Sequence, residues 1–231
     1  MQNICKRGAT DMFFSEAFAK MGKEEKEIFY KTVFMLDDSE YAAGVRLEYY
    51  RSVLKSMGEN VKIGVGVKIE NPHLVSLGNG VIIGDDCTLH AREGSYIDIG
   101  DKVMLCERVY LDTQCEGGYI EIGASAYLGT GTTMFGHRGL EIGDHALIAQ
   151  NVTLTPYSHK FADRDRNIIL QGGNMKKVSI GKDSYIGMGA CIMYSGDVGE
   201  GSVIGAGAVV VKPIPPYSVA VGCPAKVIKN R

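Results

Sequence analysis

Residues 180–210 decide the fold, and they read IGKDSYIGMGACIMYSGDVGEGSVIGAGAVV. An aliphatic residue occupies every sixth position of this stretch: Ile180, Ile186, Ile192, Val198, Ile204 and Val210. Glycine follows four of them, and a small residue stands four positions after each of the first five. A hexapeptide is long enough for a short strand and a corner, but too short for a helix that turns back on itself. The repeat therefore predicts a solenoid of short strands.

Three hexapeptides make one coil, and the same register continues upstream in groups that begin at Leu77, Ile99, Ile122 and Ile142. Short insertions interrupt the coils between these groups, and one long insertion falls between Leu154 and Ile180. We expect the aliphatic residues to point inward and neighbouring coils to pair as parallel strands about 4.8 Å apart. About seven coils would form a triangular prism on the order of 30 Å tall, stabilised by contacts between neighbouring coils.

The chain changes character near Gly58. The segment 1–58 holds 5 of the 7 phenylalanines but only 4 of the 30 glycines. Apolar residues at helical spacing predict two helical segments, from Asp11 and from Lys23, and a third that begins at the N-cap Ser39 and stops at Gly58. The predicted organisation is a helical cap over one end of the solenoid (1–58), the solenoid itself (59–221) with an inserted loop (155–177), and a basic C-terminal tail (222–231).

The charge balance excludes several classes of partner. Lys and Arg total 25 and Asp and Glu total 27, so no basic field would attract nucleic acid or an anionic membrane.

The longest apolar run, 203–211, is far too short for a membrane span. The first residues lack the apolar core of a secretory signal, and the six cysteines form no C-x-x-C pair. We therefore expect a cytoplasmic protein with reduced thiols.

The hexapeptide pattern resembles that of the hexapeptide-repeat acyltransferases, and the resemblance covers residues 59–231. It implies an all-β solenoid, a left-handed parallel β-helix, with an N-terminal helical extension. The left hand comes from the resemblance alone, because the general rule for parallel crossovers favours the right hand. The family's enzymes are trimers that hold acetyl-CoA and the acceptor in clefts between subunits. The resemblance thus implies a homotrimer that uses acetyl-CoA and requires no metal.

The long insertion carries His159, one of five histidines. Histidine is the side chain best suited to take a proton from a hydroxyl or an amine near neutral pH. The run from Ile142 to His159 resembles the one that ends in the catalytic His of maltose- and galactoside-type O-acetyltransferases. The spacing of His159, Phe161 and Asp163 looks closer to polysaccharide-biosynthesis O-acetyltransferases. The resemblance implies that His159 is the general base and that Asp163 and His137 bind the acceptor.

The C-terminal coils carry the rest of the resemblance, from Ile204 to Lys229. The tetrahedral oxyanion of acyl transfer needs a hydrogen-bond donor, and the resemblance implies a backbone N–H of Gly187 or Met188. Small residues would let the pantetheine arm lie against the backbone, and lysines would bind the CoA phosphates. The cofactor-binding residues implied in this way are Gly187, Met188, Gly205, Ala206, Ala208, Lys212, Lys226 and Lys229.

Three other interpretations are to be weighed. N-acetyltransferases of nucleotide-linked amino sugars share this fold but often carry a Rossmann unit, and the segment 1–58 shows no strand–Gly-loop–helix pattern. The γ-type carbonic anhydrases hold a metal with histidines five positions apart, and no two histidines here have that spacing. A non-catalytic scaffold would need neither the His159 loop nor the basic tail. The favoured function is an acetyl-CoA-dependent O-acetyltransferase acting on a sugar or polysaccharide precursor by direct transfer, without a cysteine nucleophile.

Overall fold

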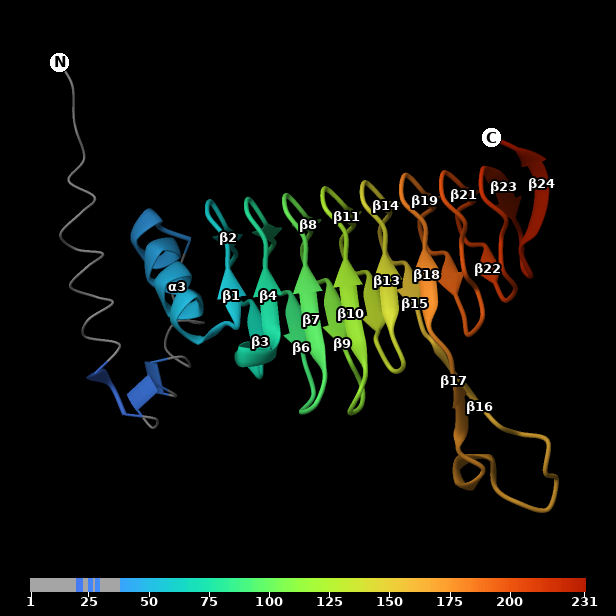
Figure 1. Ribbon diagram of the computed structural model, residues 1–231, viewed down its shortest axis with the longest axis horizontal. Helices are drawn as coiled ribbons and strands as arrows, with labels where there is room; N and C mark the ends of the chain where they lie inside the picture. Colours follow the sequence, from blue (N-terminus) through green and yellow to red (C-terminus); the bar gives the residue numbers. More distant parts are fainter. Residues whose placement is uncertain (1–19, 23–24, 27, 30–37) are drawn as a thin grey trace.

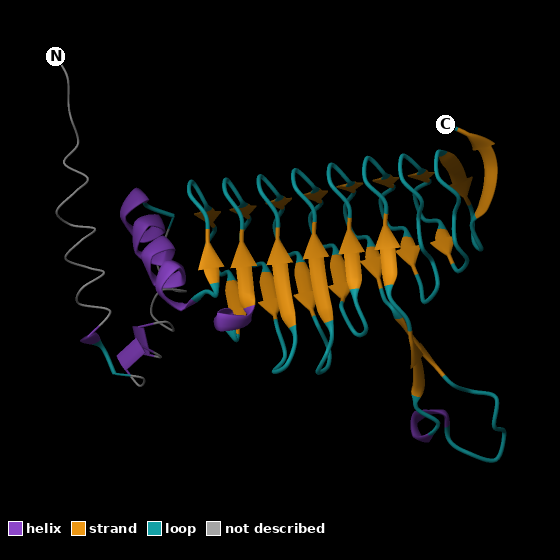
Figure 2. Cartoon of the chain, in the orientation of Figure 1, coloured by secondary structure: helices purple, strands orange, loops and turns teal. Residues whose placement is uncertain are grey.

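A computed structural model describes residues 20–22, 25–26, 28–29 and 38–231, and shows a parallel β-solenoid with one projecting hairpin (Figures 1 and 2). The predicted fold class is confirmed, and the coil geometry is consistent with the left-handed β-helix that the resemblance implies. The two helical segments predicted from Asp11 and Lys23 lie almost wholly outside the described residues. Among the described residues, no helix is long and apolar enough to cross a bilayer.

Three sheets form the faces of the solenoid. Sheet A contains β1 (Ser56–Met57), β4 (Val75–Leu77), β7 (Tyr96–Ile99), β10 (Tyr119–Ile122), β13 (Leu140–Ile142) and β18 (Val178–Ile180). Sheet B contains β2 (Lys62–Ile63), β5 (Ile82–Ile83), β8 (Met104–Leu105), β11 (Tyr127–Leu128), β14 (Leu147–Ile148), β19 (Tyr185–Ile186), β21 (Val203–Ile204), β23 (Ser218–Val221) and β24 (Lys226–Asn230). Sheet C contains β3 (Lys68–Glu70), β6 (Thr88–His90), β9 (Tyr110–Asp112), β12 (Thr133–Phe135), β15 (Thr153–Leu154), β20 (Cys191–Ile192) and β22 (Val209–Val210).

The strand register follows the hexapeptide spacing. Ile99 pairs with Leu77 on one side and with Ile122 on the other, and Ile142 pairs with Ile180 across the longest insertion. These five side chains are 3% exposed or less, and they belong to one continuous core that runs the length of the solenoid. The predicted insertions therefore leave the coils at the corners without shifting the stack.

Glycine at the corners allows neighbouring coils to approach closely. A Cβ built on Gly129 would lie 2.6 Å from the backbone carbon of Ala149 in the next coil, closer than real Cβ contacts. A larger residue at this position would force the two coils apart, so the glycine is a requirement of the packing.

Helix α3 (Glu40–Val53) covers the first coil at one end of the solenoid (Figure 1). The predicted N-cap is confirmed, because the Ser39 hydroxyl accepts from the N–H of Ala42 at 3.2 Å. The buried Arg46 and Tyr50 then donate to backbone oxygens of the first coil. The helix ends earlier than Gly58, because Ser56–Met57 pair with β4 as the first strand of sheet A.

Candidate active site

The long insertion forms a hairpin arm, defined here as residues 156–175. Within it, β16 (Tyr157–His159) pairs antiparallel with β17 (Gly173–Met175). The arm leaves the solenoid between β15 and β18, where sheet C passes into sheet A, and projects away from the coils (Figure 1). The insertion is thus a two-stranded hairpin at its base, and residues 160–167 of its tip are in neither helix nor strand.

Hydrogen bonds within the arm shape its tip, which carries the short 3₁₀ helix η2 (Ile168–Leu170). The Gln171 side chain donates to the backbone oxygens of Asp163 and Arg166, at 2.8 and 2.7 Å, and accepts from the N–H of Asp163 at 3.1 Å. One carboxylate oxygen of Asp163 accepts from the N–H of Asp165 at 3.0 Å. Asp163 therefore forms part of the tip, where it lines an open pocket of about 410 Å³.

His159 is exposed at the end of β16, and Tyr157 lies beside it. Residues i and i+2 of a strand point to the same side, and here the two rings meet edge to face with centroids 4.7 Å apart. The phenol oxygen of Tyr157 is 3.3 Å from Nδ1 of His159. The expected base thus has one ring nitrogen in contact with a hydroxyl on its own strand.

His137 lies against the other side of this pair. It follows β12 at a corner of the solenoid with a φ of 36°, and its ring stacks on Tyr157 with centroids 4.9 Å apart and planes 15° apart. Burial lowers the pKa of His137, and the charge of Asp112 only partly offsets this effect. Within the described residues, the buried Nδ1 of His137 has no hydrogen-bond partner. Tyr157 therefore joins a histidine of the solenoid and a histidine of the hairpin arm into one aromatic cluster.

A charged network adjoins this cluster along sheet C. Asp112 is 1% exposed and accepts from the Arg92 guanidinium, the Tyr110 hydroxyl and the N–H of Gln114. Burial opposes ionisation of Asp112, but these hydrogen bonds outweigh it and lower the pKa of the carboxyl. His90 is 3.7 Å from the same carboxylate. The network keeps a negative charge near His137.

The two backbone amides expected to stabilise an oxyanion differ in their hydrogen bonding. The N–H of Gly187 donates to the backbone oxygen of Ile204 at 2.8 Å, so the stacking of coils already uses it. The N–H of Met188 makes no hydrogen bond within the described residues, and its side chain is 54% exposed. Of the two, Met188 is the amide that remains available.

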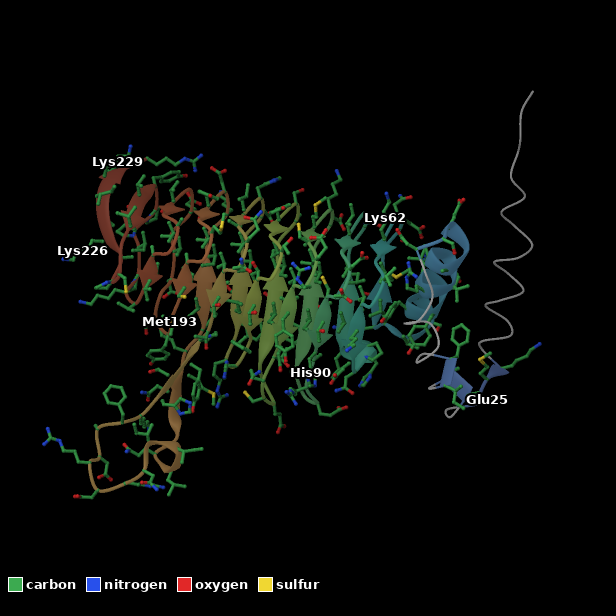
Figure 3. The ribbon with its side chains drawn as sticks, turned by 180° about the vertical axis from the view of Figure 1, so that it is seen from behind. Glu25, Lys62, His90, Met193, Lys226 and Lys229 are labelled. Atoms are coloured by element: carbon green, nitrogen blue, oxygen red, sulfur yellow. The ribbon has the colours of Figure 1, made fainter. Side chains whose placement is uncertain are left out.

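Of the residues expected to bind the cofactor, Gly187 and Met188 follow β19, and the others lie between β21 and the C-terminus. Gly205 and Ala206 form the corner after β21, whereas Ala208 is fully buried and offers only its backbone to a ligand. Lys226 and Lys229 are exposed on β24, which adds an antiparallel strand to β23. They lie at the opposite end of the solenoid from Lys62 (Figure 3).

One chain brings only some of the expected residues together. His137 and His159 meet through Tyr157, a residue that sequence reasoning missed although its i, i+2 spacing from His159 was visible. Met188 lies at the corner between sheets B and C, whereas the hairpin arm leaves at the corner between sheets C and A. The whole width of sheet C separates those two corners.

The described residues contain no group of three or more His, Cys, Asp and Glu side chains that could hold a metal ion. The cysteines among them are free thiols, and burial raises the pKa of Cys87 to about 12. That thiol stays protonated at neutral pH and is a poor nucleophile.

Sequence comparisons show that the chain is similar to several acetyltransferases. The family model described as hexapeptide repeat of succinyl-transferase matches residues 177–212. A probable acetyltransferase of Mycobacterium tuberculosis is 33% identical over 171 residues, which cover 71% of this chain and 54% of the relative. The galactoside O-acetyltransferase of Escherichia coli is 37% identical over 137 residues, covering 58% of this chain and 64% of that enzyme. The chain thus spans about half to two thirds of the length of these relatives.

Solved structures show the same fold. The polysialic-acid-specific acetyltransferase NeuO has a TM-score of 0.55 at 26% identity, covering 76% of this chain and 82% of that one. AntD, an N-acyltransferase from Bacillus cereus solved with dTDP and 3-hydroxybutyryl-CoA, has a TM-score of 0.57 at 23% identity, covering 80% and 88%. The chain is therefore similar in sequence and in fold to hexapeptide-repeat acyltransferases, as its sequence resemblance predicted.

Proposed function

We propose that this protein is an acetyl-CoA-dependent O-acetyltransferase that acts on a sugar or a polysaccharide precursor. The observation that carries the proposal is His159, an exposed histidine held on an ordered hairpin arm. The run that ends in His159 resembles that of galactoside-type O-acetyltransferases, and a galactoside O-acetyltransferase is 37% identical to this chain over 137 residues.

The proposed reaction is a direct transfer with His159 as the general base. His159 takes the proton of the acceptor hydroxyl while the hydroxyl oxygen attacks the thioester carbonyl carbon. When the tetrahedral intermediate collapses, the carbon–sulfur bond breaks and the departing thiolate takes the proton from the imidazolium. The products are the acetyl ester and the free CoA thiol, and no cysteine of the protein forms a covalent intermediate.

The N–H of Met188 is the proposed donor to the oxyanion. It has no partner within the described part of the chain and lies at an exposed corner. Because a backbone N–H is already fixed in place, it needs no reorganisation when the negative charge of the oxyanion develops. The adjacent amide of Gly187 supports the corner by its bond to Ile204.

Acetyl-CoA is the proposed donor substrate, placed along the last coils. Gly205 and Ala206 have little bulk at an exposed corner, so an extended pantetheine arm can approach the backbone there. The ammonium groups of Lys212, Lys226 and Lys229 are exposed and available to the CoA phosphates. Acetyl-CoA as the donor and reduced cysteine thiols both agree with the cytoplasmic location that we expect from the sequence.

A homotrimer is the proposed assembly, with each site shared between two subunits. Within one chain, the width of sheet C separates His159 from Met188, so one copy does not bring the base and the oxyanion donor together. A neighbouring copy that presents its corner between sheets B and C to the hairpin arm would complete the site. Light scattering should then give about three times 25.0 kDa. A fully active monomer would contradict the shared site.

An acceptor array with acetyl-CoA, read by release of the free CoA thiol, tests the proposed function. Saccharide hydroxyls should support release, and hydroxylamine should cleave the product because it is an ester. Release with amino sugars alone, giving a hydroxylamine-resistant amide, would replace O-acetylation by N-acetylation. No release with any acceptor, together with no thermal shift on adding acetyl-CoA, would favour a non-catalytic scaffold.

A further inference from the structure

The hairpin arm holds the two rings of β16 in a fixed relation. Tyr157 and His159 point to the same side of the strand, and Gly173 pairs directly with His159 on β17. A Cβ on Gly173 would overlap the Tyr157 ring, so the ring lies across the strand where only glycine leaves space. The absence of a side chain at Gly173 therefore leaves room for the Tyr157 ring beside His159.

The solenoid fixes the same tyrosine from the other side. His137 stacks on the Tyr157 ring with centroids 4.9 Å apart, and Phe135 contacts His137 edge to face at 6.2 Å. His137 is half-buried, and burial lowers its pKa, so the ring that supports Tyr157 is neutral at neutral pH. A neutral support adds no positive charge beside His159, where an imidazolium forms during transfer. Tyr157 thus links a corner of the solenoid to the exposed His159.

The two tautomers of His159 have different chemical consequences. If the Tyr157 hydroxyl donated to Nδ1, the proton of the neutral ring would lie on Nε2, and that nitrogen would have no lone pair for an acceptor. If Nδ1–H instead donates to the phenol oxygen, the lone pair is on Nε2, the nitrogen away from the tyrosine. A phenol oxygen accepts and donates at once, so Tyr157 can receive this bond while its own O–H points elsewhere.

We propose that Tyr157 is a positioning residue that accepts the Nδ1–H of His159 and so orients the ring with Nε2 free to remove a proton. This inference rests on the proposed function, because it assigns His159 the task of a base. It gives His137 the role of supporting Tyr157, in addition to the contact with acceptor expected from the resemblance. Tyr157 acts on the reaction only through His159.

The test compares Tyr157→Phe with wild-type protein. The phenylalanine ring keeps the stack on His137 and removes only the hydroxyl. The expected result is a fall in kcat of about 10- to 100-fold, the range for loss of one hydrogen bond to a charged group, with an unchanged KM for acetyl-CoA. Tyr157→Ala should reduce kcat at least as much. The matched control is Tyr96→Phe, which removes a hydroxyl bonded to Glu121 in another stacked tyrosine pair and should retain wild-type kcat.

A second readout needs no activity. In ¹⁵N–¹H spectra of the full chain, neutral His159 should be protonated at Nδ1, and Tyr157→Phe should move the proton toward Nε2. An Nε2–H tautomer in wild-type protein, or an unchanged tautomer and kcat in Tyr157→Phe, would overturn the inference. If His159→Ala loses activity in that case, the proposed function still stands. If the tautomer responds as expected but His159→Ala keeps full turnover, the hydrogen bond between Tyr157 and His159 is confirmed, but the proposed base is wrong and the positioning role is overturned with it.

Discussion

Ile142 and Ile180 lie side by side in parallel register in neighbouring coils, although the whole hairpin arm separates them in the sequence. Both side chains are buried, at 3% and 2% exposure, so the core continues without interruption where the hairpin arm leaves it. The arm is therefore an addition to a complete stack, and the proposed base His159 lies outside the part of the chain that forms the core.

Deleting residues 156–175 and joining Thr155 to Lys176 tests this separation. The deletion restores an uninterrupted coil of three hexapeptides between Ile142 and Ile180, so we expect the free energy of unfolding to change by about 1 kcal/mol or less. Acetyl transfer should be lost because His159 is removed. Circular dichroism, thermal unfolding and thiol release measure these outcomes. Collapse of the solenoid in the deletion variant would show that the arm is part of the core.

Strand β14 offers a matched pair of substitutions on opposite faces. Ile148 is 0% exposed between Leu128 and Ile186, whereas the adjacent Leu147 is 44% exposed. Ile148→Ala should cost about 2–5 kcal/mol, because it removes buried apolar area and leaves a cavity. Leu147→Ala should change the free energy of unfolding of a single subunit by about 0.5 kcal/mol or less. Similar losses in urea unfolding for the two variants would contradict the assigned register.

The coil register was predictable from the sequence, because each inward aliphatic residue must stack on its counterpart in the next coil and the insertions can be counted. The arm was not predictable in the same way. Its strands have no period, and the contact between Tyr157 and His137 depends on a solenoid corner that the spacing does not describe. The use of the Gly187 amide within the coil stack was equally invisible, because it depends on which carbonyl of the next coil lies opposite.

Lys226 and Lys229 test the placement of acetyl-CoA. Phosphate contacts bind the ground state and the transition state alike, so replacing both lysines with alanine should raise the KM for acetyl-CoA more than it lowers kcat. The control is the double alanine variant of Lys62 and Lys68, which are exposed on β2 and β3 of the first coil. Equal KM values for wild-type protein and the Lys226/Lys229 variant would move the phosphate site elsewhere.

Direct transfer predicts sequential kinetics in every cysteine variant. Single replacement of Cys87, Cys106, Cys115, Cys191 or Cys223 by Ser or Ala should leave the kinetic order unchanged, since no thiol carries the acetyl group. The raised pKa of Cys87, about 12 because of burial, already makes that thiol a poor nucleophile at neutral pH. Initial-rate patterns in both substrates measure the order. A ping-pong pattern would point to a covalent intermediate.

The turnover of His159→Ala tests the central claim most directly. A positioned general base contributes about 10²–10⁴-fold, so kcat should fall by at least about 10²-fold. The melting temperature and the affinity for acetyl-CoA should hardly change, because His159 is exposed on the arm. His145→Ala, also exposed but outside the arm, should retain wild-type turnover. Near-wild-type kcat in His159→Ala would contradict the account, because the proton would then be removed by another group.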